Sequence, residues 1–216
     1  PIEYFIEGGR SRTGRLLKPK LGMLSMTVDS WVKTQKKPLA FIPVYIGYEK
    51  LIEGNSYIGE LYGQKKKKEN LFTSIKSILM LKGQFGKVTT SFGEPIKINE
   101  LLHKQHENWG NEDRNTVKQQ DWFRSTVSDL SHQIMLRINA AAVINPVNLI
   151  ATTILATPRQ SIDEFDLLQQ CDFYKQLIES QPYLDSITLQ DNGNERELRR
   201  IEQQGLIHIH PHKLGN

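Results

Sequence analysis

A glycine- and arginine-rich segment near the start of the chain has residue types that could bind an anion. It reads Glu7-Gly8-Gly9-Arg10-Ser11-Arg12-Thr13-Gly14-Arg15 and follows a short apolar run, Tyr4-Phe5-Ile6, which predicts a buried strand. Glycine lets a backbone turn sharply, and the N–H groups of such turns form anion-binding concavities. Arginine adds planar, permanently charged groups that suit phosphate or carboxylate. The sequence therefore predicts a phosphate or carboxylate site at the end of a strand.

Two alternatives compete with this interpretation. A solvated surface loop could have the same composition. A nucleotide-binding P-loop also follows a strand, and Gly9 and Gly14 have the separation that it requires. However, Arg15 and Leu16 stand where a P-loop needs Lys and Ser or Thr. The phosphate-binding lysine and the magnesium-binding hydroxyl are both missing, so the segment does not predict a nucleotide site.

Composition places the chain among globular proteins of a reducing compartment. Its 216 residues suffice for one large domain, or one domain with a smaller companion, and 38% of them are hydrophobic. The single cysteine, Cys171, excludes an internal disulfide and is predicted to be a packing residue. No uninterrupted apolar stretch approaches the length of a transmembrane helix. The chain begins at Pro1 without a methionine, already inside a strand-like run, so we expect a fragment of a longer protein.

Charge is distributed unevenly along the chain. The first 97 residues hold 17 Lys and Arg against 8 Asp and Glu, a net charge of +9, whereas the remainder holds 11 against 16, a net charge of −5. A basic first half indicates an anionic ligand, an anionic membrane surface or nucleic acid. The run Lys65-Lys66-Lys67-Lys68 is either simply solvated or a contact for phosphate or anionic lipid.

The first half alternates predicted strands and helices. The spacing of apolar residues predicts a helix from Leu21 to about Lys36, with lysines and Pro38 at its end. Residues Leu39–Ile46 form a continuous apolar run, which predicts a second buried strand parallel to the first in a βαβ unit. Pro43 cannot donate to a ladder, so it marks an edge, a bulge or a point of ligand approach. Further on, we predict a helix over Leu71–Leu81 and a strand over Val88–Phe92.

Beyond Leu101 the sequence becomes mostly helical. A polar stretch, His103–Gln120, precedes predicted helices over Val127–Ala142, Pro146–Leu155, about Ser161–Ser180 and Glu195–Gln204, with a turn at Asp191–Asn194. Pro146 suits a first helical turn, and Ser161-Ile162-Asp163-Glu164 predicts a capping box. The sequence thus predicts an α/β fold, in which a partly parallel sheet precedes a mainly α-helical region.

Three histidines alternate near the end of the chain, in a predicted strand over Leu206–His210. His208, His210 and His212 would share one face of such a strand, which a metal could use. No cysteine or acidic residues accompany them at zinc-site spacing. Structural or solvent-exposed histidines are therefore the favoured interpretation, and no metal site is predicted.

Two motifs in order resemble the glycerolipid acyltransferase family. Phe5-Ile6-Glu7-Gly8-Gly9-Arg10-Ser11 is similar to the third conserved block of that family, with the pattern Phe-x-Glu-Gly-x-Arg-Ser. Phe41-Ile42-Pro43-Val44-Tyr45-Ile46-Gly47 is similar to the fourth block, at the right spacing. The resemblance extends over the whole chain and is closest to the bacterial branch that acylates glycerol 3-phosphate.

The resemblance implies roles for particular residues. Glu7, Gly8 and Gly9 would shape the pocket for glycerol 3-phosphate, while Arg10 and Arg12 would hold its phosphate with Ser11 alongside. The fourth block would line the acyl or acceptor side, here through Ile42, Pro43 and Val44. Residues 1–101 would be the last part of an acyltransferase α/β domain, and residues 102–216 a mainly helical C-terminal region.

The family's catalytic histidine is not found in this sequence. In the family, a His-x4-Asp block supplies a general base that deprotonates the glycerol hydroxyl for attack on an acyl thioester. None of the six histidines of this chain has an aspartate five positions further on. The resemblance therefore predicts no catalytic residue in this chain, which should be inactive alone.

The implied partners follow from the family's reaction. They are glycerol 3-phosphate, acyl-CoA or acyl carrier protein, and an anionic membrane surface at the cytoplasmic face of the bacterial inner membrane. No cofactor, metal or nucleic acid is expected. The alternative from another functional class is a non-catalytic module that binds phosphate, an anionic membrane or nucleic acid. Nucleic acid is disfavoured because the aromatic residues lie in core-like runs rather than between basic residues.

Overall fold

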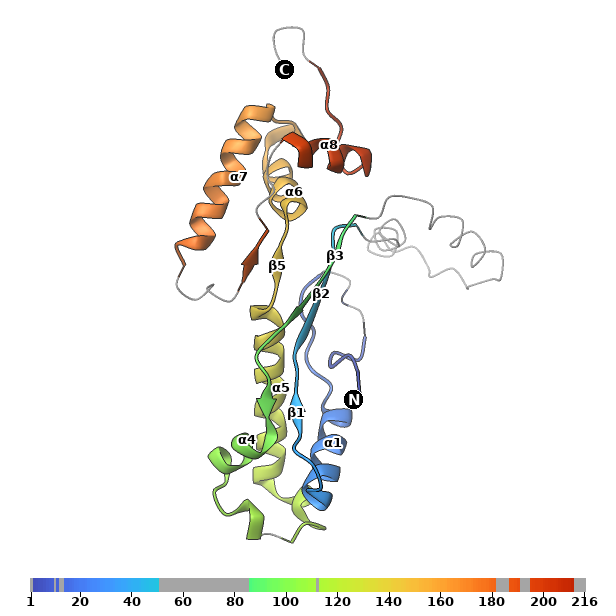
Figure 1. Cartoon of the computed structure of the whole chain (residues 1–216), viewed down its shortest axis with the longest axis vertical. Helices are drawn as coiled ribbons and strands as arrows, with labels where there is room; N and C mark the ends of the chain where they lie inside the picture. Colours follow the sequence, from blue (N-terminus) through green and yellow to red (C-terminus); the bar gives the residue numbers. More distant parts are fainter. Residues whose placement is uncertain are drawn as a thin grey trace, which may run out of the picture. The chain divides into compact units, whose positions relative to one another are not determined.

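The computed structural model describes residues 2–9, 11, 14–50, 86–111, 113–181, 187–190 and 195–211 (Figure 1). The chain divides into two compact units, each assembled from separate stretches of sequence. Unit 1 comprises residues 1–45 and 91–141, and unit 2 comprises residues 46–90 and 142–216. The residues predicted to bind substrate all belong to unit 1.

Unit 1 is built on two helices that pack against each other, α1 (Leu21–Thr34) and α5 (Asp121–Ala140), which run side by side in Figure 1. Leu24, Val28 and Val32 recur every four residues on α1 and are fully buried. The predicted helix is confirmed, and it ends where Gln35 adopts a left-handed conformation and donates its N–H to the carbonyl of Trp31. Helix α4 (Ile98–Gln105) and the 3-10 turns η1 (Trp109–Asn111) and η2 (Val117–Gln119) are the other helical elements among the described residues of unit 1.

Among the described residues, two pairs of short strands come between α1 and α4 in the sequence, and residues 46–48 and 88–90 of the second pair belong to unit 2. β1 (Ala40–Phe41) pairs antiparallel with β4 (Ile96–Lys97), and β2 (Val44–Tyr48) pairs with β3 (Val88–Phe92). Exposure alternates along β3, which confirms the strand predicted over Val88–Phe92. Ile6 and Ile96 are buried in the core of unit 1 together with residues of α1, α4 and α5.

The first predicted strand does not form, so the predicted parallel βαβ pairing is not observed in the described residues. Tyr4-Phe5-Ile6 is irregular, with Ile6 buried but Phe5 85% exposed. Apolar composition alone did not predict this outcome, because a strand also needs a partner and no described strand pairs with this run. The predicted strand over Leu39–Ile46 is divided into β1 and β2 at Ile42 and Pro43, in agreement with the inability of proline to donate to a ladder.

Unit 2 has its own core, formed around α6 (Pro146–Ala156), α7 (Glu164–Glu179) and α8 (Glu195–Gln203). Helix α6 packs against α7, and the 3-10 turn η3 (Pro158–Gln160) connects them. β5 (Val143–Ile144) pairs in parallel with β6 (Thr188–Leu189). Ile207 and Ile209 pack against this core after the last helix.

Most of the predicted elements of unit 2 are confirmed. Pro146 occupies the first turn of α6, and the side chains and backbone N–H groups of Asn145 and Asn148 bond reciprocally in a capping box. Helix α7 is capped by Asp163, not by Ser161 as the sequence suggested, because the Asp163 carboxylate accepts the N–H of Phe165.

One other prediction for unit 2 is wrong, and three lie on residues that the structure does not describe. Leu206–His210 is not a strand, because Ile207 and Ile209 are held by the helical core and the N–H of Ile209 donates to Glu202 instead of to a ladder. The predictions for Lys65–Lys68, Leu71–Leu81 and Asp191–Asn194 lie outside the described residues.

The fold class is mixed α/β, as predicted, and the described residues include a parallel pair, β5–β6, which is not the expected one. The division at residue 101 stays a prediction, and that position lies within α4. Among the described helices, none has both the length and the apolar character needed to cross a bilayer.

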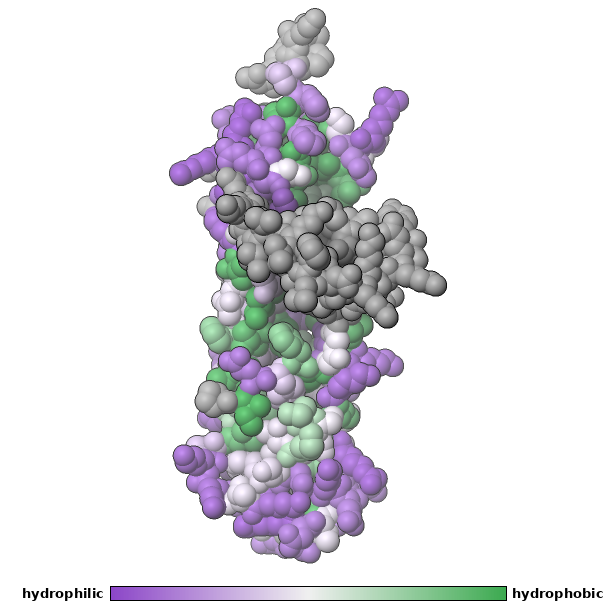
Figure 2. All heavy atoms as spheres, turned by 90° about the vertical axis from the view of Figure 1, so that its right-hand side faces the viewer, coloured by the Kyte–Doolittle hydropathy of each residue, from purple (hydrophilic) through white to green (hydrophobic). Residues whose placement is uncertain are grey.

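Large apolar side chains also reach the surface of each unit. In unit 1 they include Phe5 and Phe92, which is 72% exposed, and in unit 2 they include Phe165 and Phe173. Figure 2 shows green, apolar atoms lying among purple, hydrophilic ones on one face. Single exposed apolar residues are common in folded proteins, so they do not by themselves mark a binding site.

Candidate anion-binding site

The predicted anion-binding segment begins with a tight turn. The N–H of Gly8 donates to the carbonyl of Phe5 at 3.0 Å, and Gly8 has a φ of +62°. This left-handed conformation favours glycine. Space favours glycine as well, because a Cβ at this position would lie only 2.9 Å from Cγ of Lys20. Ile6 anchors the turn in the core of unit 1. Glycine at position 8 therefore permits both the turn and its close packing against Lys20.

The start of α1 lies beside this turn. The N–H of Lys20 donates to the carbonyl of Ile6 at 2.7 Å, and Lys20 is the residue immediately before the helix. No acidic residue occupies the first turn of α1, and no side chain caps it. The first N–H groups of a helix lack intrahelical partners and carry partial positive charge. The electrostatics next to the turn thus favour an anion.

The predicted binding residues that follow Gly8 are only partly described. Gly9 is exposed, and Glu7 is half-buried. Ser11 is half-buried, and its hydroxyl oxygen is inaccessible to solvent with no hydrogen-bond partner among the described residues. Arg10 and Arg12 lie outside the described residues, so their contact with a phosphate stays a prediction. A buried hydroxyl normally finds a partner, and the predicted place of Ser11 beside the phosphate stays a prediction.

The residues of the second motif lie at the junction of two strands. Ile42 is 57% exposed, Pro43 is buried and Val44 is half-buried at the start of β2. The carbonyl of Pro43 accepts the N–H of Gly93 at 2.8 Å, which fixes this junction to the end of β3. Their predicted role on the acyl or acceptor side stays a prediction.

A charged network in unit 2 was not anticipated from the sequence. The Glu49 side chain is 1% exposed and receives two hydrogen bonds from the Arg200 guanidinium, at 2.6 and 2.9 Å. The N–H of Lys87 donates to the same carboxylate at 2.8 Å, and Arg200 also contacts Glu197. Burial alone would raise the pKa of Glu49, but the hydrogen bonds from Arg200 and Lys87 outweigh it and lower that pKa.

This network has a structural role that the sequence only hints at. Arg200 is separated from Glu49 by 151 positions, so no local spacing could reveal the pair. The one available signal was the strong amphipathic pattern of α8, whose inner face buries Glu197, Leu198 and Ile201. The bidentate pair joins α8 to the residue that follows β2.

Two other candidates from the sequence carry no visible site. Cys171 is buried on α7, where its sulfur lies 3.6 Å from the Thr153 hydroxyl, and burial raises the pKa of its thiol. It is a packing residue, as predicted. The rings of His208 and His210 lie 6.5 Å apart, and His212 is outside the described residues. Within the described ranges, no group of three His, Cys, Asp or Glu residues is placed to hold a metal.

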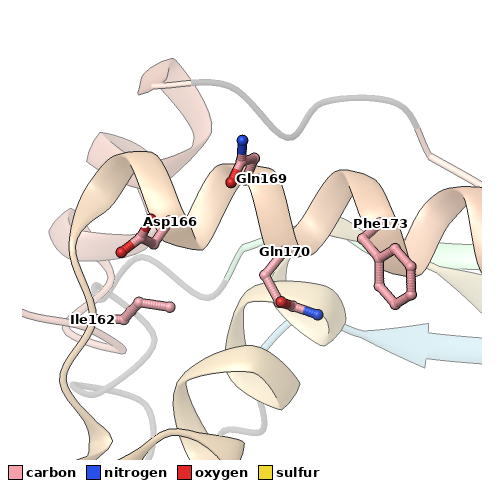
Figure 3. A pocket seen from close by; sticks show the side chains of 5 residues that line it. All are labelled: Ile162, Asp166, Gln169, Gln170 and Phe173. Carbon is pink, nitrogen blue, oxygen red and sulfur yellow. The ribbon is translucent and has the colours of Figure 1, made fainter.

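A shallow hollow of about 440 Å³ lies on α7 in unit 2, lined by Ile162, Asp166, Gln169, Gln170 and Phe173 (Figure 3). The side chains of Gln169 and Gln170 point in different directions from the helix. The polar groups that line this hollow therefore do not converge on one ligand atom, as the polar groups of most binding sites do. None of the predicted substrate-binding residues lines it.

Comparisons with a family profile and with individual proteins point to the same family. The profile of the family described as "Glycerol-3-phosphate acyltransferase C-terminal region" matches residues 57–216. The whole chain is 40% identical to a protein named glycerol-3-phosphate acyltransferase from Pseudomonas fluorescens and 43% identical to one from Xanthomonas campestris, covering 26% and 24% of those proteins. A relative of the same name from Pseudomonas aeruginosa is 41% identical over 99% of the chain. The chain spans about a quarter of the length of these relatives.

Proposed function

Because this chain belongs to the glycerol-3-phosphate acyltransferase C-terminal region family, we propose that it supplies the glycerol 3-phosphate pocket of such an acyltransferase. The reaction transfers a fatty acyl group from acyl-CoA or acyl carrier protein to the 1-hydroxyl of glycerol 3-phosphate. The Gly8 turn beside the uncapped start of α1 carries the proposal, because it offers an anion backbone donors and positive potential.

The division of labour follows from the residues present. Gly8 and Gly9 let the backbone approach the phosphate, Ser11 donates a hydroxyl, and Arg10 and Arg12 neutralise the phosphate charge. Glu7 shapes the pocket, and Ile42, Pro43 and Val44 line its acyl or acceptor side. The general base that removes the proton from the 1-hydroxyl comes from outside these 216 residues, since none of their histidines has the His-x4-Asp spacing.

The proposed setting is the cytoplasmic face of the bacterial inner membrane. The +9 charge of the first 97 residues suits anionic phospholipid, the phosphates of CoA and acidic acyl carrier protein.

Calorimetric titration and turnover assays together test this function. The native polypeptide that contains this chain should bind glycerol 3-phosphate and release CoA from acyl-CoA when glycerol 3-phosphate is added, but not when glycerol is added. The 216 residues alone should release no CoA. Binding of phosphate to the native polypeptide without any acyl transfer would support a non-catalytic anion-binding module instead, and failure to bind glycerol 3-phosphate would contradict the proposal.

A further inference from the structure

Lys20 is the charged residue that the structure brings to the glycine turn, although it lies outside both recognised motifs. Its backbone N–H donates to the carbonyl of Ile6, two positions before Gly8. Its side chain packs against the turn, because a Cβ on Gly8 would lie 2.9 Å from Cγ and 3.6 Å from Cβ of Lys20. Backbone and side chain are thus both fixed to the same turn.

The position of the stem limits where the ammonium can go. Lysine carries its charge at the end of a flexible four-carbon stem, only three bonds beyond Cγ. In the observed conformation Cγ lies against Gly8, which places the ammonium within three bonds of an atom that contacts the turn. Lys20 is exposed, so the charge can meet a ligand from solvent.

The Lys20 ammonium makes no ion pair or hydrogen bond with another described residue, whereas two other lysines of unit 1 are engaged in ion pairs. Lys33 pairs with Asp29 at 3.0 Å, and Lys97 pairs with Glu100 at 2.8 Å. The charge of Lys20 is therefore available, and it lies beside the helix start that has no acidic residue in its first turn.

We propose that Lys20 is a further phosphate-binding residue, which makes the pocket selective for glycerol 3-phosphate over uncharged glycerol. This inference rests on the proposed function and deepens it. A lysine is a mobile point charge and cannot form the planar, two-pronged contact of an arginine. Lys20 therefore contributes attraction for the phosphate charge, while the arginines of the motif fix its orientation.

Three variants of the native polypeptide test the role of Lys20. Lys20→Met keeps an unbranched apolar stem against Gly8 and removes the charge, Lys20→Arg keeps the charge, and Lys18→Met removes an exposed charge two positions away. We expect Lys20→Met to raise the KM for glycerol 3-phosphate about tenfold, in line with the loss of one charged contact. The KM for the acyl donor and the kcat should stay within about twofold, and Lys20→Arg and Lys18→Met should resemble the unmodified protein.

The outcomes separate this inference from the function on which it rests. If the unmodified polypeptide transfers acyl groups but Lys20→Met has the same KM as Lys18→Met, the role of Lys20 is wrong and the proposed function stands. An equal rise in the KM of both substrates would also overturn the role of Lys20, because a general loss of structure affects both. If the unmodified polypeptide neither binds glycerol 3-phosphate nor transfers acyl groups, both proposals fail.

Discussion

At the scale of single residues, Gly8 is constrained by conformation and by space at the same time. Its φ of +62° is costly for any residue with a side chain, and a Cβ at this position would lie only 2.9 Å from Cγ of Lys20. The turn that it forms connects the core residue Ile6 to the predicted phosphate-binding residues. A change at position 8 should therefore affect stability and phosphate binding together.

We expect Gly8→Ala to lower the free energy of unfolding by about 1–2 kcal/mol, because strain and crowding add. Urea unfolding followed by circular dichroism measures this effect. Gly22→Ala is the matched control, since Gly22 lies in α1 with open space around its Cβ position and should become neutral or slightly stabilising. A loss at position 22 as large as that at position 8 would contradict the account of the turn.

Glu49 illustrates how a buried charge depends on its partners. Removal of Arg200 would leave a carboxylate without its charged partner in a site that is almost closed to solvent. We expect Arg200→Leu to cost roughly 3 kcal/mol of unfolding free energy. Glu100→Gln, which breaks an exposed pair with Lys97, should leave the urea midpoint nearly unchanged. Similar effects of the two substitutions on the urea midpoint would argue against a buried network.

The same carboxylate gives the chain a defined pH dependence. The pKa of Glu49 is lowered in the folded state, so the folded state binds a proton less readily than the unfolded one. The stabilisation from Glu49 is complete above the unfolded-state value of about 4.3 and disappears as the pH falls through the lowered folded-state pKa. In urea titrations at several pH values, Glu49→Gln should lose less stability than the unmodified chain over this acidic range. Parallel curves for the two proteins would show that another group is responsible.

At the scale of elements, local signals predicted the helices better than the strands. The four-residue repeat of α1, the proline that opens α6 and the amphipathic pattern of α8 are each contained within one element. The strands depend on partners elsewhere in the chain. Two segments have strand-like sequences but pair with no described strand, Tyr4-Phe5-Ile6 and Leu206–His210. The pattern of apolar residues within a segment could not show whether a partner strand exists.

The cap of α6 shows how a local signal stabilises an element. The Asn145 side chain accepts the N–H of Asn148, and the Asn148 side chain accepts the N–H of Asn145. We expect Asn145→Ala to lower the unfolding free energy by about 1 kcal/mol, while Asn145→Ser, which retains an acceptor oxygen, should lose much less. Thermal unfolding of the two variants makes the comparison. Equal melting temperatures would show that the cap contributes nothing.

At the scale of the whole molecule, the two motifs identified the family, but the structure could not be predicted from them alone. The division into two units could not be predicted, because each unit joins two separate stretches of sequence. The pair of Glu49 and Arg200 and the contact of Lys20 with Gly8 depend on tertiary packing and left no spacing to read. The glycine turn itself was predictable, because its glycines and arginines are contiguous in sequence.

The uneven distribution of charge along the chain agrees with the proposed place of the phosphate site. The basic first part contains the glycine turn, Lys20 and the predicted phosphate-binding arginines, whereas the acidic remainder supplies most of the helices. A site for a doubly charged phosphate ester is expected where positive charge is concentrated. The central claim is therefore that this first part recognises the phosphate of glycerol 3-phosphate.

Steady-state kinetics of Arg10→Ala in the native polypeptide that contains this chain test that claim most directly. Loss of one charged, bidentate contact should raise the KM for glycerol 3-phosphate by at least about tenfold and leave the KM for the acyl donor nearly unchanged. Equal changes in the two KM values, or no change in either, would contradict phosphate recognition by this loop.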